Sequence, residues 1–269
     1  MDLKYIFNRL WIDYISQNPS AGKIYDLFVK EGEKADNDHI AFRTIDFPEI
    51  NIDVIARPFI VNGYVPKGNY EFKDKHLFAQ HYELPGDKNA PRVFISQLIL
   101  SDCSPYIQTS FMEFLKKVDP GRFTSEDLLF SGTLFNPLSY ETYTHLRKES
   151  EYAAWFYVFG FRANHFTVSI NSLRKYNNIY KVNDFIKNNG FLLNSSGGEV
   201  KGKPDDLLQQ SSTMADIVKV RFLEGEFEIP ACYYEFAQRF PDSTGHLYSG
   251  FIAKSADKIF ESTNFYGKK

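Results

Sequence analysis

The stretch Asn37-Asp38-His39-Ile40-Ala41-Phe42 decides the fold, because it returns later in the chain as Ala163-Asn164-His165-Phe166-Thr167-Val168. The two histidines lie 126 residues apart, and both stretches have the residue pattern of a strand. In each copy a helical pattern and an Asn-Gly turn follow, at Asn62-Gly63 and Asn189-Gly190, which lie 127 residues apart. The chain therefore contains a repeated unit that begins with a histidine-bearing strand.

A third pair of matching segments closes each copy. Pro91-Arg92-Val93-Phe94-Ile95-Ser96 resembles Pro230-Ala231-Cys232-Tyr233-Tyr234-Glu235, at a distance of 139 residues along the chain. A constant order with a modest insertion in the second copy is what a duplicated strand–helix–three-strand unit would show. Two copies are too few for a solenoid, so we expect a paired module in which each half completes the core of the other.

The rest of the chain is arranged around these two modules. Residues 1–33 are predicted to form N-terminal helices, because their apolar residues keep a helical period. Module one is expected over residues 34–102 and module two over residues 161–269. Between them, residues 103–160 carry helical patterns and form a helical insert. We expect all 269 residues to act as a single functional domain.

Composition narrows the class of protein. The 269 residues are 43% hydrophobic and 24% charged, which is typical of a globular protein and argues against disorder. A net charge of −3 gives no electrostatic basis for binding a nucleic acid or an anionic membrane. The longest strongly apolar stretch, residues 152–161, is roughly half of what a membrane span needs. Two cysteines, Cys103 and Cys232, make no disulfide framework, so we expect a soluble protein of the reducing cytoplasm.

Three residues of the repeat form a candidate metal site. His39 and His165 occupy the same position on the first strand of each module, and Glu235 lies on the last strand of module two. A lone histidine on an apolar strand is more often a core residue, but the repeated position favours a ligand role. Two imidazoles and a carboxylate make a facial triad that leaves open positions on the metal. These donors suit Fe(II), with Mn, Ni, Co and Zn as other possibilities.

Two arginines are candidates for substrate binding. Strand side chains alternate, so Arg43 shares a face with His39, at about 13 Å between Cα atoms. A guanidinium there could hold a substrate carboxylate some distance from the metal by paired hydrogen bonds. By the same alternation Arg239 shares a face with Glu235. For both arginines, a surface position beside a local acid is the alternative.

The other histidines are predicted to have no ligand role: His76, His81 and His145 are expected on the solvent side, and His246 in a loop. A glyoxalase-type lyase or isomerase is one rival function. It would need a fourth ligand, but the place in module one that matches Glu235 falls on Ser96 and Gln97, which offer no carboxylate. A metal-free module that binds a small molecule is the second rival.

Several motifs together resemble the 2-oxoadipate dioxygenase/decarboxylase family of bacteria and plants. They are Asp38-His39-Ile40-Ala41-Phe42-Arg43-Thr44, Asn164-His165-Phe166-Thr167-Val168, residues 231–240 and residues 250–261. The resemblance covers residues 5 to 265. It implies the vicinal oxygen chelate fold: an α+β protein whose paired βαβββ modules form a curved, half-open barrel of mixed sheet, with added N-terminal and central helices.

The resemblance also implies an activity. The family's metal ligands would fall on His39, His165 and Glu235, and its substrate-carboxylate arginine on Arg43; Phe251 is a further candidate for substrate contact. The expected enzyme is a non-haem Fe(II) dioxygenase that decarboxylates and hydroxylates a 2-oxo dicarboxylic acid. The best candidate reaction is 2-oxoadipate and O2 to 2-hydroxyglutarate and CO2, as in lysine catabolism. The chain is shorter than well-characterised members, which leaves the exact 2-oxo acid open.

Overall fold

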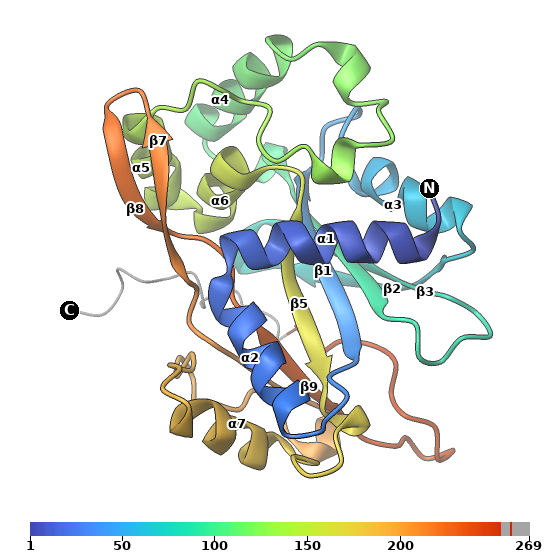
Figure 1. The fold of residues 1–269 in the computed structure, drawn as a ribbon. Coiled ribbons are helices and arrows are strands. Elements are labelled where there is room, and N and C mark those ends of the chain that lie inside the picture. Colours follow the sequence, from blue (N-terminus) through green and yellow to red (C-terminus); the bar gives the residue numbers. More distant parts are fainter. Residues whose placement is uncertain (254–258, 260–269) are drawn as a thin grey trace.

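A computed structural model of the chain describes residues 1–253 and 259. In this part, seven strands form one mixed sheet in the order β2-β3-β4-β1-β5-β9-β6, which curls into a half-open barrel (Figure 1). This confirms the predicted α+β fold. The strands of the sheet are β1 (Asn37–Ile45), β2 (Val65–Phe72), β3 (Leu77–Glu83), β4 (Arg92–Leu98), β5 (Ala163–Ser169), β6 (Leu208–Ser212) and β9 (Glu235–Arg239).

Six of the seven helices in the described part of the chain begin after a residue whose side chain caps the first turn. The side chains of Asp2, Asn51, Ser104, Ser139, Ser150 and Asn178 each accept a backbone N–H of the first turn that they precede. The predicted N-terminal and inserted helices are both present. The helices are α1 (Leu3–Gln17), α2 (Pro19–Lys30), α3 (Ile52–Val61), α4 (Pro105–Lys116), α5 (Tyr140–Glu149), α6 (Glu151–Phe159) and α7 (Ile179–Asn188).

The two modules join at the centre of the sheet, where β1 and β5 run antiparallel with Ala41 opposite His165. On either side the arrangement repeats: β1 pairs with β4 in parallel, and β5 pairs with β9 in parallel. The repeated histidine strands are therefore direct neighbours. This pairing brings residues that are more than a hundred positions apart in the chain onto one surface.

Module two differs from module one in its outer strands. The segment after α7 forms isolated bridges instead of a strand: Lys201 pairs with Gln210 of β6, and Leu193 pairs with Thr213, which directly follows β6. An additional hairpin, β7 (Ile217–Phe222) and β8 (Gly225–Pro230), forms a small sheet of its own and stands to one side of the molecule (Figure 1). This hairpin is the insertion that the spacing of the repeat predicted.

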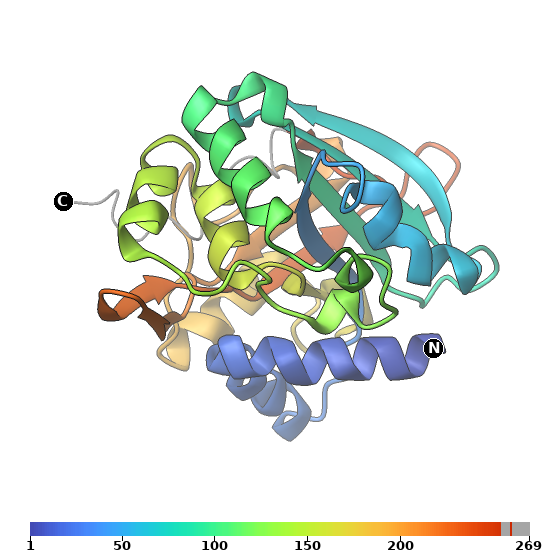
Figure 2. The same ribbon diagram turned by 90° about the horizontal axis from the view of Figure 1, so that it is seen from above.

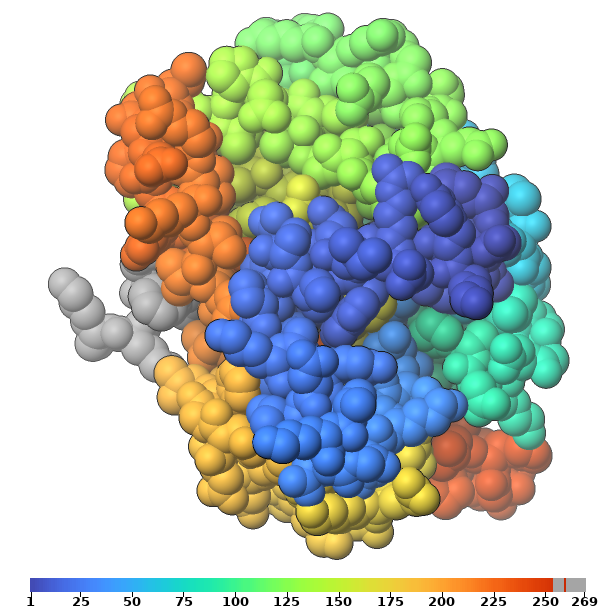
Figure 3. Space-filling model, viewed as in Figure 1, coloured from blue at the N-terminus to red at the C-terminus, as the bar shows by residue number. Residues whose placement is uncertain are grey.

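The N-terminal helices cover one face of the sheet. Phe166 of β5 packs against Trp11 and Tyr14 of α1, with ring centroids 5.1 and 5.0 Å apart. Phe236 of β9 packs against Phe28 of α2 at 6.4 Å. Figure 2 shows α1 and α2 on one side of the sheet, and in Figure 3 the residues of these helices cover part of the front of the molecule. Each buried ring removes roughly 150–250 Å² from water, so aromatic packing is a major part of what holds the helices on the sheet.

The opposite face of the sheet, which we call the inner face, receives the alternate side chains. Because Phe166 and Phe236 point towards the N-terminal helices, their neighbours His165 and Glu235 point the other way. The inner face is therefore where polar side chains of both modules meet.

None of the helices in the described part of the chain is both long and apolar enough to cross a membrane.

Candidate metal centre

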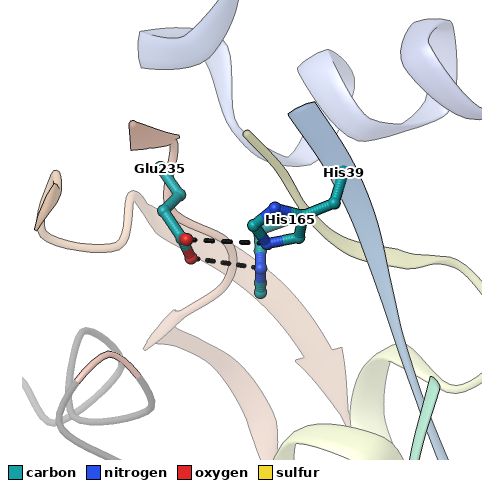
Figure 4. Close-up of side chains that lie close together, drawn as sticks. All are labelled: His39, His165 and Glu235. Atoms are coloured by element: carbon teal, nitrogen blue, oxygen red, sulfur yellow. Dashed lines mark ion pairs between the residues drawn. The ribbon is translucent and has the colours of Figure 1, made fainter. Parts of the chain in front are cut away.

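Three buried side chains of the inner face meet at one point, His39 from β1, His165 from β5 and Glu235 from β9 (Figure 4). Their possible ligand atoms all lie within 4.8 Å of one another. The His39 Nε2 lies 3.5 Å from the Glu235 Oε1, and the His165 Nε2 lies 3.2 Å from the Glu235 Oε2. The residues are only 2%, 5% and 1% exposed. The three residues chosen from the repeat thus form one compact cluster.

The residue before each histidine fixes its imidazole. The His39 Nδ1 lies 2.8 Å from the Asp38 Oδ1, and the His165 Nδ1 lies 3.0 Å from the Asn164 Oδ1. Both oxygens are acceptors, so each Nδ1 carries its hydrogen and each Nε2 presents a lone pair to the cluster, where the His39 Nε2 also lies 3.1 Å from the Thr167 hydroxyl. Histidines that bind metals are oriented in this way by a partner on the other ring nitrogen. Sequence reasoning missed this role, although an Asp or Asn precedes the histidine in both copies.

The charge of Asp38 is held by Arg239. The Arg239 Nε donates to the Asp38 Oδ2 at 2.7 Å and its Nη2 donates to the Asp38 Oδ1 at 2.8 Å. Burial is the largest single influence on the Asp38 carboxyl and opposes its ionised form, but the charge and hydrogen bonds of Arg239 and the contact with His39 together lower its pKa. Arg239 is therefore a buried partner of Asp38, and the alternative of a surface charge is wrong.

Without a cation, the three clustered groups are held close to neutral. Burial raises the pKa of the Glu235 carboxyl to about 8, although the Gln210 amide, which donates to its Oε1 at 2.6 Å, acts in the opposite direction. Burial also lowers the pKa of His39 and of His165. A divalent cation would keep Glu235 ionised and would use both imidazoles in their neutral form. The donor set of two nitrogens and one carboxylate, with no thiolate, fits such a cation.

The Asp38 contact gives a first testable prediction. Replacing Asp38→Asn removes the charge that holds the His39 Nδ1–H and leaves Arg239 without its carboxylate. We expect the affinity for Co(II) to fall by about 10- to 100-fold, the usual effect of removing such a partner of a metal ligand. Titration of the metal-free variant, followed by the Co(II) absorption spectrum, measures it. Asp36→Asn, at a half-exposed position just before β1, is the matched control, and equal affinities for all three proteins would contradict the prediction.

Arg43 lies on the inner face beyond the cluster of His39, His165 and Glu235, which we call the metal cluster after its expected role. Arg43 is buried. Its guanidinium carbon lies 4.9 Å from the ring centroid of Tyr152 and 5.0 Å from that of Trp155, both on α6. Tyr152 is itself fixed, because its hydroxyl accepts the Thr44 N–H at 3.0 Å and donates to the Ser96 carbonyl at 2.6 Å. The inserted helices thus set the position of Arg43, and the surface alternative for it is wrong.

The region around Arg43 is also open to solvent on one side. A pocket of about 250 Å³ is lined by Arg43 and Tyr152 together with residues of the β2–β3 connection and α5. On its other side, Arg43 is close enough to the cluster for its positive charge to affect His165. It is the third cause of the lowered pKa of His165, after burial and the charge of His39. Arg43 therefore lies between a solvent-facing pocket and the metal cluster.

Phe251 covers the metal cluster. Its ring is buried, with its centroid 4.8 Å from that of His39 at an angle of 88°. The motif of residues 250–261 that includes it lies mostly outside the described residues, which end at 253 apart from residue 259. Phe251 thus lies next to the candidate metal ligands, and its contact with a substrate stays a prediction.

His81 is buried, so the prediction of a solvent-side position was wrong. Its Nδ1 lies 2.8 Å from the Tyr70 hydroxyl, and its Nε2 lies 3.0 Å from the Glu83 carboxylate. Lysines precede this strand, and the pattern did not reveal that Phe251 of the C-terminal segment would pack on His81. His76, His145 and His246 are exposed, as predicted.

The counterpart of Glu235 in module one is Phe94. In the sheet register Ala41, two residues after His39, lies opposite Phe94, just as Thr167 lies opposite Glu235. The alignment on the two prolines placed it at Ser96 and Gln97, two or three residues too far, because Pro91 directly precedes β4 whereas Pro230 ends β8, several residues before β9. Phe94 offers no ligand atom either. Among the described residues the cluster therefore offers three possible ligands, with no fourth carboxylate at the symmetric position.

The curled sheet with its paired histidine strands defines the fold class of the chain. A Ralstonia eutropha protein, provisionally described as a member of the glyoxalase superfamily, shares this fold at 18% identity and a TM-score of 0.74, over 91% of this chain and 83% of that chain. Within this class, the chain belongs to the 2-oxoadipate dioxygenase/decarboxylase family, whose profile matches residues 12–245.

Individual relatives agree with this membership. The rice 2-oxoadipate dioxygenase/decarboxylase is 37% identical, over 93% of this chain and 76% of its own length. The structure of rice hydroxyglutarate synthase in complex with 2-oxoadipate is 35% identical, with a TM-score of 0.92 over 97% of this chain and 91% of that chain. A Shewanella frigidimarina structure, provisionally described as a hydrolase, is 48% identical, with a TM-score of 0.88 over 93% and 97%. The chain is an enzyme of this dioxygenase family, whose chemistry implies a metal.

Proposed function

We propose that this chain is a non-haem Fe(II) dioxygenase that acts on a 2-oxo dicarboxylic acid, with 2-oxoadipate as the best candidate. One observation carries the proposal: a buried cluster of two histidines and a carboxylate shares a face of the sheet with a buried arginine. Family membership and the 2-oxoadipate bound to the rice relative support the choice of substrate. We further propose that the whole chain forms one functional domain, because the cluster draws on both modules.

The residues would divide the work as follows. His39, His165 and Glu235 would hold the iron, which when bound supplies the activation of dioxygen and of the 2-oxo acid. Arg43 would bind the distal carboxylate of the substrate, and its fixed position between two rings would select for chain length. Phe251 and the aromatic residues around Arg43 would exclude water from the reacting groups.

The overall reaction balances without any co-substrate other than O2. One molecule of 2-oxoadipate and one of O2 give one of 2-hydroxyglutarate and one of CO2. The carboxylate next to the oxo group leaves as CO2, the oxo carbon becomes the new carboxylate, and the neighbouring carbon gains the hydroxyl group. The two oxygen atoms of O2 therefore end in the new carboxylate and in the hydroxyl group.

The role of Arg43 can be tested by chain selectivity. Arg43→Ala should lower kcat/KM for 2-oxoadipate by about 10- to 100-fold, because a hydrogen bond to a charged group contributes about 1.5–3 kcal/mol. The value for 2-oxohexanoate, which lacks the distal carboxylate, should change much less. Arg221→Ala, on the exposed hairpin, serves as the control. An unchanged preference between the two acids would remove Arg43 from the substrate site.

The proposed activity itself is tested by anaerobic reconstitution with Fe(II), followed by measurement of oxygen uptake over a panel of 2-oxo acids. We expect uptake with six-carbon 2-oxo dicarboxylic acids. No uptake with any acid despite bound iron would refute a dioxygenase. Conversion of a substrate without oxygen uptake would indicate the lyase or isomerase, and the absence of both metal binding and turnover would indicate a binding module.

The cellular setting is also a proposal. We infer a reducing compartment such as the cytoplasm, because Cys103 and Cys232 are both buried and unpaired. Decarboxylation of 2-oxoadipate would place the enzyme in lysine degradation. Fractionation of the source cells with antibody detection measures the compartment, and recovery of the chain in an oxidising compartment would contradict it.

A further inference from the structure

The guanidinium of Arg239 contacts Asp38, which holds the proposed metal ligand His39. It also contacts the segment of residues 248–251, which covers the site. Two nitrogens of Arg239 donate to the two oxygens of Asp38, which in turn holds the Nδ1–H of His39. A third nitrogen, Nη1, donates to the carbonyl of Tyr248 at 3.0 Å and to that of Gly250 at 2.7 Å. The guanidinium carbon also lies 5.1 Å from the Phe251 ring centroid. Arg239 is only 3% exposed, so all these contacts are made away from water.

Residues 248–251, which we call the cover segment, lie over the imidazole of His39. The Phe251 ring contacts His39 directly and also packs on Phe94, with centroids 4.8 Å apart. The Phe251 N–H donates to the Tyr70 hydroxyl at 3.1 Å, which gives the backbone of this segment a further anchor beside the two from Arg239. With the cover segment in place, the three clustered ligands are almost completely buried.

A second and longer route leads from the cover segment to the same aspartate. The Tyr70 hydroxyl contacts His81, and His81 contacts Glu83. Arg92 then lies 3.8 Å from Glu83 and 3.6 Å from the Asp38 Oδ2. These last distances are longer than hydrogen bonds, so this route is weaker than the one through Arg239. Both routes nevertheless end on Asp38, which makes it the point where the cover segment and the metal cluster meet.

We propose that Arg239 is a positioning residue that couples metal binding at His39 to closure of the cover segment. The proposal rests on the proposed function, since it takes His39 as a metal ligand. If the cover segment moves away, the Nη1 of Arg239 loses two carbonyl partners inside the protein, and the guanidinium must move or rehydrate. Asp38, and with it the orientation of the His39 imidazole, then loses its support. Arg239 suits this task because its planar fork serves a carboxylate and two carbonyls at once.

Coupling of this kind works equally in both directions. A metal on the His39 Nε2 fixes the imidazole, and thereby Asp38, Arg239 and the cover segment. Closure of the cover segment must raise the affinity for the metal by the same factor, because coupling between two binding or closing events is reciprocal. Factors of about 5- to 150-fold are typical. The site would then be most strongly closed when it is loaded.

Hydrogen exchange with Co(II) as the probe tests the coupling. In the full-length protein, saturation with Co(II) should slow amide exchange over residues 248–252 by about 5- to 150-fold. Arg239→Lys keeps the charge but cannot serve Asp38 and both carbonyls together, so it should still bind Co(II) while exchange in this segment no longer responds. Arg221→Lys on the exposed hairpin is the matched control and should behave as the original protein. The same Co(II)-dependent slowing in Arg239→Lys would overturn the proposal.

A double-mutant cycle on Co(II) affinity gives the reciprocal measurement. Phe251→Ala, which loosens the cover segment, should weaken Co(II) binding clearly in the original protein but little in the Arg239→Lys background. Additive effects of the two substitutions would overturn the coupling. If Arg239→Lys does not fold, Asp38→Asn takes its place, because it weakens the link between His39 and the cover segment. The same Co(II)-dependent slowing of amide exchange in Asp38→Asn as in the original protein would also overturn the coupling. Failure of the original protein to bind Co(II), or binding that survives His39→Ala, would instead refute the metal site.

Discussion

Glu235→Gln is expected to lose the metal and nearly all turnover. The substitution keeps the size of the side chain and leaves Gln210 beside it, but it removes the one negative charge in the ligand cluster. Two neutral imidazoles alone cannot compensate a buried divalent cation, since burial of an uncompensated charge is strongly unfavourable. We therefore expect kcat for 2-oxoadipate to fall by at least about 10³-fold, as for other groups that work as a unit with the reacting centre.

The measurement combines metal content with oxygen uptake. Both proteins are loaded with Fe(II) without oxygen, desalted, analysed for bound iron and then supplied with 2-oxoadipate and O2. Glu226→Gln, an exposed position on β8, is the matched control and should retain both iron and turnover. A Glu235→Gln protein that retains stoichiometric iron and normal turnover would exclude Glu235 from the site.

The second large effect concerns stability without metal. As the pH rises from about 4.5 to about 8, the free energy of unfolding of the metal-free original protein should fall relative to that of metal-free Glu235→Gln. The carboxyl has a pKa near 4.5 when unfolded and about 8 when folded, because burial disfavours its ionised form. Within that window the folded state keeps a proton that the unfolded state releases, so stability falls with pH by up to about 1.4 kcal/mol per unit. Over the whole window the difference amounts to about 5 kcal/mol.

Urea unfolding of both chelator-treated proteins at several pH values measures this difference. His39 and His165, whose lowered pKa values destabilise the folded state as the pH falls through their unfolded range, are present in both proteins and cancel in the comparison. Addition of Co(II) should remove the loss in the original protein, because the metal stabilises the ionised carboxylate. Parallel stability curves for the two metal-free proteins would contradict the assigned burial of this charge.

The sequence revealed the parts of the site that repeat or alternate. His39 and His165 could be found because they hold the same position in two copies, and strand alternation then placed Arg43 and Arg239 on the faces where the structure has them. Glu235 stood out as a carboxylate among aromatic residues. These signals are local, or they recur within the chain, and one sequence is enough to read them.

The contacts that depend on distant segments could not be predicted. The rings of Tyr152 and Trp155 around Arg43 come from the inserted helices, and no pattern states where an insert will dock. The link between Arg239 and Asp38 joins residues 201 positions apart. Burial of His81 depends on the C-terminal segment that covers it. The register that makes Phe94 the counterpart of Glu235 required the strand pairing itself, because the two prolines lie at different distances from β4 and β9.

In the proposed function, the metal cluster and Arg43 together carry an oxygen-dependent decarboxylation of a 2-oxo dicarboxylic acid. The most direct test supplies the Fe(II)-loaded protein with 2-oxoadipate under isotopically labelled dioxygen and analyses the products by mass spectrometry. We expect equal amounts of O2 consumed and CO2 released, and 2-hydroxyglutarate that carries both labelled atoms, one in the new carboxylate and one in the hydroxyl group. Unlabelled product, or release of CO2 without oxygen uptake, would contradict the proposed function.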